Sequence, residues 1–319
     1  MLTMKIVIVG YGEMLEALVE GVSKTEHEIV GVFRRENVMY NPISRFLHDA
    51  IKPSHDFNLV RNLNLYDIKA SGVNSEKFVK EIEKLEADII LVGSWSEKFS
   101  AQTINSPKKA CINVHPSLLP KYRGPNPYYQ VILNNEAFTG VTFHLMDINY
   151  DSGAMLHQKQ VEVRPKDTGN ALRLRCCDAV RREVKILLSD FDDKLQNRVS
   201  QNENQATYQP QITLRDCILD FTQEPSDEID RKIRGLNPWL NCFIPYGNQF
   251  FGFSKYKLHS SMTPKEPANI VKKTKNSLYV ACADGRVMEF SDVKIKTIFP
   301  KQVTKFYMKK IIKTNTKAV

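Results

Sequence analysis

The chain has 319 residues, of which 42% are hydrophobic and 25% are charged, and its formal net charge is +9 at pH 7. These proportions are ordinary for globular protein, and the length exceeds that of a usual single domain, so we expect two domains with separate cores. Charged residues interrupt every hydrophobic stretch well short of the roughly 20 residues that a membrane-spanning helix needs. We therefore expect no membrane partner.

Strand and helix patterns alternate along the first 191 residues. Residues 5–9 form a continuous apolar run, and residues 13–22 carry apolar side chains at helical spacing. The alternation continues to a long amphipathic helix that opens at 167–168, with further strands expected at 27–33, 88–92, 111–114 and 139–146. The pattern predicts an α/β domain over residues 1–191 with a doubly wound, mostly parallel, Rossmann-like sheet.

The turn Gly10-Tyr11-Gly12 after the first strand invites comparison with a dinucleotide-binding fingerprint. Leu15 stands where the third glycine is required, and Phe33-Arg34-Arg35 lacks the acid expected at the end of the second strand. We interpret the turn as an ordinary strand-to-helix connection. An oxidoreductase is correspondingly disfavoured.

A polar stretch separates this domain from the rest of the chain. Residues 192–207 are rich in Asn and Gln and almost free of apolar side chains, so we expect a linker without order of its own. Beyond it, turn signals separate short β-like runs at 217–221, 249–253, 278–282, 287–290 and 293–298. With one helix at 226–235, they predict a small, OB-like β-barrel domain over residues 208–319.

The six cysteines show no Cys-x-x-Cys pair and no spacing typical of a disulfide framework. We expect reduced thiols in a cytoplasmic protein and no metal site.

Basic charge is concentrated in the second predicted domain. Residues 208–319 contain 19 Lys and Arg and 10 Asp and Glu, which leaves 26 of the 45 basic and 26 of the 36 acidic residues for the first 207. Eight lysines and no acidic residue follow Asp292. Such a surface would attract a polyanion if the lysines share one face, although a solvated tail is the plainer interpretation.

Candidate chemistry is concentrated at one strand end. Asn113 and His115 are two residues apart on a strand, so their side chains point to the same side. Pro116 and Pro120 end the strand and stiffen a loop at the carboxyl edge of the sheet, where open α/β proteins bind ligands. Asp151 follows the strand at 139–146, and its carboxylate could orient and charge-balance His115. Taken singly, each of the three also has an ordinary structural interpretation.

In combination, these segments resemble the folate-dependent formyltransferase family. That family has Asn-x-His at a strand end, then Ser-Leu-Leu-Pro-x-Tyr/Trp-Arg-Gly, a Thr-Gly-Val-Thr strand and Asp-x-Gly. The same order is found here in Asn113 with His115, residues 117–124, residues 139–142, and Asp151 with Gly153. Residues 217–221 and 234–239 look like the C-terminal domain of methionyl-tRNA formyltransferases, so the resemblance covers most of the chain.

The resemblance implies transfer of a formyl group from 10-formyltetrahydrofolate to a primary amine, without a metal. Asn113 and His115 would stabilise the oxyanion, and Asp151 would hold His115 and help to move the amine's proton. The folate would contact Gly93, Ser94, Trp95, Asp147 and Tyr150, together with Ser117, Leu118, Leu119 and Pro120. The acceptor would contact Tyr122, Arg123 and Gly124.

Several acceptors remain open on the sequence. A basic β-barrel favours initiator methionyl-tRNA, because phosphate contacts supply affinity for nucleic acid. Nucleotide-linked amino sugars are the alternative, since sugar N-formyltransferases share the core. Residues 34–42 lack the Gly-rich basic insert usual in the tRNA enzymes, and Pro125-Asn126-Pro127-Tyr128 also departs from them. An extra domain argues against glycinamide ribonucleotide as the acceptor, and intact catalytic residues argue against a non-catalytic tRNA-binding protein.

Overall fold

The computed structural model describes residues 3–246, 249–259 and 266–296, and contacts divide the chain into two units. The first unit comprises the residues up to Tyr128, Ala137–Val163 and Ala171–Pro210. The second comprises Tyr129–Glu136, Arg164–Asn170 and the described residues from Gln211 onward. The domain boundaries at 191 and 207 stay predictions, but residues 192–207 make their contacts within the first unit.

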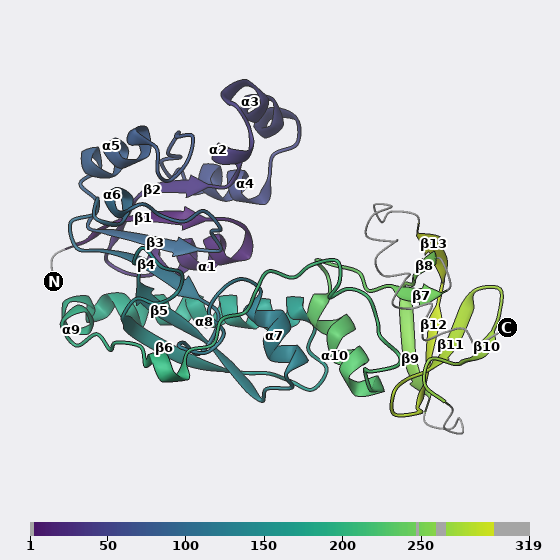
Figure 1. The fold of residues 1–319 in the computed structure, drawn as a ribbon. Helices are drawn as coiled ribbons and strands as arrows, with labels where there is room; N and C mark the ends of the chain where they lie inside the picture. Colours follow the sequence, from purple (N-terminus) through teal and green to yellow (C-terminus); the bar gives the residue numbers. More distant parts are fainter. Residues whose placement is uncertain (1–2, 247–248, 260–265, 297–319) are drawn as a thin grey trace. The chain divides into compact units, whose positions relative to one another are not determined.

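The first unit is built on a six-stranded sheet with strand order β2-β1-β3-β4-β5-β6 (Figure 1). Its strands are β1 (Lys5–Gly10), β2 (Glu28–Arg34), β3 (Ile89–Gly93), β4 (Ala110–His115), β5 (Phe138–Leu145) and β6 (Met155–Glu162). The first four strands pair in parallel, and β5 and β6 join antiparallel. This arrangement confirms the doubly wound, mostly parallel sheet.

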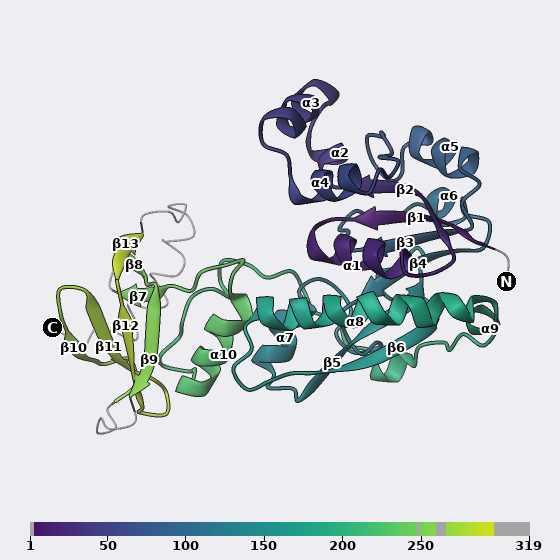
Figure 2. The same ribbon diagram turned by 180° about the vertical axis from the view of Figure 1, so that it is seen from behind.

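Helices lie on both faces of this sheet. In chain order the helical elements of this unit are α1 (Gly12–Val22), α2 (Glu36–Met39), α3 (Pro42–Ile51), α4 (His55–Asn62), α5 (Glu76–Lys84), α6 (Ala101–Ile104), α8 (Gly169–Ser189), α9 (Phe191–Gln196) and the 3₁₀ turn η1 (Glu203–Gln205). Most of α7 (Pro127–Leu133) belongs to the second unit. Phe78 and Ile82 of α5 pack with Val7 and Val9 of β1 in one buried cluster. Alternate β1 residues face the other way, and Figure 2 shows α1 and α8 beside each other, joined by the Arg173–Glu13 ion pair.

The order and direction of the strands place several strand ends at one edge of the sheet. From β1 the chain passes to β2 on one side and returns to β3 on the other, so the strand order reverses at β1. The carboxyl ends of β1, β3 and β4 therefore share one edge, with Gly10 in register with Gly93 and Gly93 in register with Val114. Open α/β proteins place their ligands at such an edge.

Two features of this unit were not expected from the sequence. Strand β6 was missed because only Leu156 and Val161 are buried along it, which leaves no regular hydrophobic alternation. The expectation that residues 192–207 lack order is wrong. They contain most of α9 and all of η1, and Val199 forms backbone hydrogen bonds with Met155 in both directions at 2.8 and 2.9 Å.

The second unit is rich in antiparallel strands. It contains α10 (Ser226–Leu236), β7 (Ile244–Tyr246), β8 (Gln249–Gly252), β9 (Lys255–His259), β10 (Ile270–Lys273), β11 (Ser277–Ala281), β12 (Val287–Ser291) and β13 (Lys294–Lys296). The described strands form two sheets, β10-β11-β12-β9 and β13-β8-β7. Strand β9 pairs antiparallel with β12 in the first of these sheets, and β8 pairs antiparallel with β13 in the second. The chain therefore passes from one sheet to the other twice, between β8 and β9 and between β12 and β13, and strands that change sheet in this way form the corners of small barrels.

The sequence predictions for this unit are partly confirmed. The runs at 249–253, 278–282 and 287–290 correspond to β8, β11 and β12. Residues 217–221 do not form a strand; an isolated bridge joins Ile218 to Phe243. Of the eight lysines after Asp292, those beyond Lys296 lie outside the described residues.

All six cysteines are buried. Within the part of the chain that the structure describes, no helix combines the length and apolar character that crossing a bilayer requires.

Candidate active site

Strand register gathers the polar side chains at the end of β4. Asn113 and His115 leave the sheet on one face, as their two-residue spacing predicts. Strand β5 pairs antiparallel with β4 and sets His144 opposite Asn113 and Thr142 opposite His115. Cross-strand partners share a face, so His144 joins the same cluster. The sequence did not single out His144, because the relevant signal is the pairing of two strands rather than a pattern within one.

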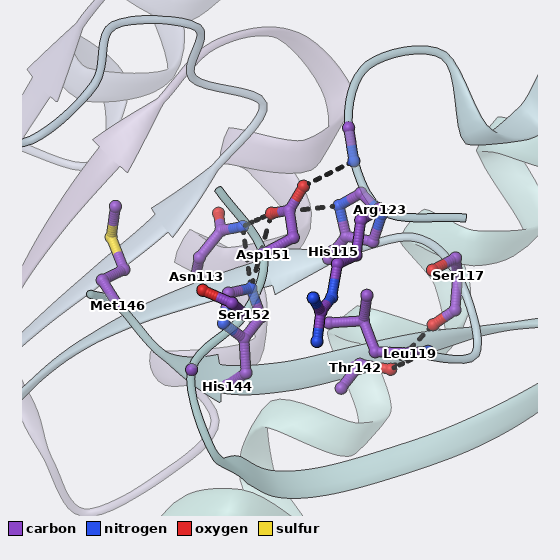
Figure 3. A network of polar contacts seen from close by, with 12 residues as sticks. Asn113, His115, Ser117, Leu119, Arg123, Thr142, His144, Met146, Asp151 and Ser152 are labelled. Carbon is purple, nitrogen blue, oxygen red and sulfur yellow. Dashed lines mark hydrogen bonds and ion pairs between the residues drawn. The ribbon is translucent and has the colours of Figure 1, made fainter. Parts of the chain in front are cut away.

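Asp151 completes the cluster from the loop between β5 and β6 (Figure 3). Its Oδ1 lies 3.2 Å from Asn113 Nδ2, 3.5 Å from His115 Nδ1 and 3.7 Å from His144 Nε2. Its Oδ2 accepts a hydrogen bond of 2.8 Å from the Gly124 backbone N–H. The structure thus brings together the three side chains predicted to be catalytic.

The hydrogen bonds of His115 define its tautomer. Nε2 lies 2.8 Å from the Tyr122 carbonyl oxygen, which can only accept, so Nε2 carries the hydrogen. Burial lowers the pKa of His115, with a further contribution from His144, although the charge of Asp151 and the Tyr122 carbonyl act in the opposite direction. The imidazole is therefore neutral at pH 7, with an unprotonated Nδ1 that faces Asp151.

Asp151 is ionised under the same conditions. Burial raises the pKa of this carboxyl group, but the N–H groups of Gly124 and Asn113 donate to the anion, and a proton taken up by either neighbouring imidazole favours the anion further, so the pKa is held well below its usual range. A buried carboxylate beside Nδ1 stabilises the imidazolium that forms when His115 takes up a proton. The pair can therefore act as a general base.

The amide of Asn113 is held in a defined orientation. His144 Nδ1 lies 2.9 Å from the Leu145 carbonyl oxygen and must donate to it, which leaves His144 Nε2 as an acceptor. Asn113 Nδ2 donates to that nitrogen at 3.1 Å and to Asp151. An oxygen atom that develops negative charge near β4 could take over one of these N–H groups.

The loop after β4 holds the site through its backbone. Tyr122 and Gly124 both have positive φ, 61° and 92°, and a Cβ atom at Gly124 would lie 2.6 Å from the Gln209 carbonyl oxygen. Glycine is the residue that fits this conformation and this close approach. Arg123 between them is buried, with its guanidinium held by Gln201 and Glu203.

An open cleft of about 530 Å³ lies in the first unit beside the Asp151 loop. It is lined by Arg123, Asp147, Asn149, Tyr150, Ser152, Glu203, Ala206, Thr207 and Tyr208. Arg123, Asp147 and Tyr150 are among the residues predicted to bind ligands. The last four belong to a stretch in or just after the predicted linker, which the sequence did not connect with the site.

The other residues predicted to bind folate lie outside the lining of this cleft. Gly93 ends β3 beside Val114, Ser94 is exposed with φ 58°, and Trp95 packs 5.5 Å from the Phe33 ring. Ser117 is buried, with its hydroxyl donating to the Lys121 carbonyl, while Leu118 adjoins Gly140. Leu119 is buried before Pro120. Folate binding by these residues stays a prediction.

The fold and the cluster together define a class of protein. A neutral imidazole, a carboxylate and an oriented amide at the carboxyl edge of an open α/β sheet can accept a proton and bind a developing oxyanion. These are the needs of an enzyme that transfers a carbonyl-containing group to a nucleophile.

Comparison with known proteins gives the family. Residues 4–188 match the model of the formyl transferases, and residues 211–312 match that of the formyl transferase C-terminal domain. The chain therefore belongs to the formyltransferase family and is a formyl-transferring enzyme.

Relatives match it over nearly their whole length. The methionyl-tRNA formyltransferase of Alkaliphilus oremlandii is 30% identical over 278 residues, which cover 87% of this chain and 88% of the relative. That of Acetivibrio thermocellus is 30% identical over 294 residues, covering 89% and 90%. Among solved structures, the N-formyltransferase from Helicobacter canadensis in complex with folinic acid and dTDP-3-aminofucose has a TM-score of 0.66 at 19% identity, with coverage of 91% and 99%. At that identity the likeness shows the fold.

Proposed function

We propose that this enzyme transfers the formyl group of 10-formyltetrahydrofolate to the amino group of initiator methionyl-tRNA. The observation that carries the proposal is the convergence of Asn113, His115 and Asp151 beside an open cleft. Relatives named methionyl-tRNA formyltransferases at 30% identity, with coverage of 87% or more on both sides, support this acceptor.

The chemistry follows from the protonation states in the site. The neutral amine attacks the formyl carbon, a new C–N bond forms and the carbonyl oxygen becomes an oxyanion. An Asn113 N–H group stabilises that oxygen, while His115 Nδ1 takes the proton released by the amine. Asp151 holds the imidazolium. The adduct collapses when the bond to N10 of the folate breaks, and the imidazolium returns a proton to that nitrogen.

Each ligand has a proposed set of contacts. The folate would lie against Gly93, Ser94, Trp95, Asp147 and Tyr150 and the loop of Ser117, Leu118, Leu119 and Pro120. The acceptor would approach Tyr122, Arg123 and Gly124. Within these sets, Arg123, Asp147 and Tyr150 line the cleft and form the most direct support.

A nucleotide-linked amino sugar is the second candidate acceptor. A structural relative was crystallised with dTDP-3-aminofucose, and Arg123 lines the cleft with its guanidinium paired to Glu203. The excess of nine basic residues within positions 208–319 favours tRNA, because a sugar nucleotide needs no second basic unit.

The decisive experiment offers the full-length protein 10-formyltetrahydrofolate with methionyl-tRNA and, separately, with nucleotide-linked 4-amino sugars. We expect formylmethionyl-tRNA to accumulate and no sugar product to form. The opposite pattern would establish the sugar alternative. Binding of tRNA without product formation would leave a non-catalytic tRNA-binding protein, and formyl transfer to neither acceptor would contradict the proposal.

A second test uses charge. Lys255 and Lys257 are exposed on one side of β9, so replacing both by Gln should weaken tRNA binding and make the affinity less dependent on salt. The slope of log affinity against log salt should become shallower by about one for each phosphate that the protein no longer neutralises. Replacing exposed Lys80 and Lys84 of α5 is the matched control. Equal effects of the two double substitutions would contradict a role for β9 in tRNA binding.

A further inference from the structure

Gln201 is the most completely bonded side chain of the polar stretch at 192–207. It is 9% exposed. Its Oε1 accepts hydrogen bonds from Arg123 Nε at 3.1 Å and from Nη2 at 2.8 Å. Its Nε2 donates to the carbonyl oxygens of Asp151 and Gly153, each at 2.8 Å. A primary amide has two donor hydrogens and two acceptor positions, so its bonding capacity is filled.

These four hydrogen bonds join two parts of the active site. Arg123 lies between Tyr122, whose carbonyl fixes the tautomer of His115, and Gly124, whose N–H binds Asp151. The two carbonyl oxygens belong to the loop that carries Asp151. Gln201 therefore connects the segment 122–124, which contacts His115, with the loop that carries Asp151.

The Asp151 loop has a conformation that requires support. Asp151 has a φ of 56°, which is unfavourable for a residue with a Cβ atom. A Cβ atom at Gly153 would lie 1.8 Å from the Leu145 carbonyl oxygen, so the chain passes directly against the end of β5. Backbone in such a conformation persists where its surroundings over-determine it.

The polar stretch is itself anchored on both sides of Gln201. Val199 pairs with Met155 through two backbone hydrogen bonds, and Thr207 Oγ1 accepts the Tyr122 N–H at 2.8 Å. The backbone is therefore held by hydrogen bonds on both sides of Gln201, at Val199 and at Thr207.

We propose that Gln201 is a positioning residue, which sets the distance between the Asp151 carboxylate and His115 Nδ1 by holding Arg123 and the Asp151 loop together. This inference rests on the proposed formyl transfer. In the reaction it acts through Asp151 and does not touch the substrates.

Two substitutions of Gln201 separate this role from general packing. Gln201→Met keeps the length of the side chain and removes all four hydrogen bonds. Gln201→Glu keeps the acceptor for Arg123 but removes both donors to the Asp151 loop. Gln205 lies exposed in the same stretch and outside the lining of the cleft, so Gln205→Met is the matched control.

Kinetics give the first readout. We expect kcat to fall by about tenfold to a hundredfold in both Gln201 variants, as small misplacements of catalytic groups do, with KM for either substrate changed by less than about threefold. Gln205→Met should match the parent. A purely structural role would instead lower the melting temperature and the fraction of active enzyme at unchanged kcat per folded molecule, which would overturn the proposal.

The titration of His115, followed by NMR, gives a readout that does not require turnover. Asp151 raises the pKa of His115, so a carboxylate held less closely should let that pKa fall further. Gln201→Met, which adds no charge, should move the midpoint in the same direction as Asp151→Asn and by less. If the midpoint of Gln201→Met stays at the parental value, Gln201 does not position Asp151. Failure of the parent to transfer formyl groups would contradict the proposed function while this titration still tests Gln201.

Discussion

Two regions of the first unit meet at Asp151, and they are ordered by different forces. Strands β4 and β5 hold Asn113, His115 and His144 through backbone register above a buried core. The polar stretch at 192–207 buries few apolar side chains and is ordered by specific hydrogen bonds, above all those of Gln201. The first region can be inferred from local pattern, whereas the second depends on partners far away in the sequence. The active site needs both.

Removal of a catalytic side chain, whether it lies on a strand or on the Asp151 loop, should have the largest effect on kcat. Replacing His115 or Asp151 by Ala should lower kcat by about a thousandfold or more, because the proton acceptor or its counter-charge is lost. Folate binding, measured by direct titration, should remain. His157 lies outside this cluster, and its Nε2 is 2.7 Å from Glu183 Oε2. His157→Gln is therefore a matched control for a histidine–carboxylate pair. Near-parental turnover would remove His115 and Asp151 from the catalytic step.

Arg123 belongs to both regions, and its loss should have the next largest effect. Arg123→Met removes the partner of Gln201 and Glu203 and leaves a buried amide and an exposed carboxylate without their cation. We expect kcat/KM to fall by about a hundredfold, since the loop at residues 122–124 then loses its side-chain anchor. Glu203 is mostly exposed, so Glu203→Gln should cost far less. Equal losses in the two variants would mean that the ion pair, rather than Gln201, provides the anchor.

The pH profile sharpens the comparison further. The active form has neutral His115, whose pKa is lowered by burial from the ordinary value of 6.5, so the acid limb of kcat/KM should lie below that pH. Because Asp151 raises the pKa of His115, residual activity in Asp151→Asn should show an acid limb at still lower pH. An acid limb that moves upward in this variant would show that another group limits the rate.

The sequence predicted the strand-built region well, for reasons visible in particular residues. The two-residue spacing of Asn113 and His115 gave their common face, and apolar runs gave β1, β3 and β4. The convergence of Asp151 came from the family resemblance, since spacing alone does not show where a loop folds. His144 required the register of two strands. Gln201 lies 78 residues from Arg123 and 50 from Asp151, and composition treats such a polar residue as part of a disordered linker.

The smallest effect is expected at the other anchor of the polar stretch. Thr207→Val is nearly isosteric and removes the acceptor of the Tyr122 N–H, while the backbone hydrogen bond from Arg123 N–H to the Thr207 carbonyl remains at 2.8 Å. Thr207 is exposed, so water can replace the hydroxyl, and the free energy of unfolding should fall by no more than about 1 kcal/mol. We expect kcat to change by less than about threefold.

Thr25→Val removes a hydroxyl that accepts the His27 N–H at 3.2 Å and also donates to the Val22 carbonyl after α1, so it gives an upper limit for the cost of losing such an acceptor elsewhere. Denaturant unfolding and steady-state kinetics on the two threonine variants should then give similar losses of stability and little loss of activity. A decrease in kcat for Thr207→Val as large as that for Gln201→Met would mean that the whole polar stretch positions Asp151 as one unit. A small decrease assigns the positioning to the single buried amide of Gln201, because Thr207 holds only the neighbouring backbone.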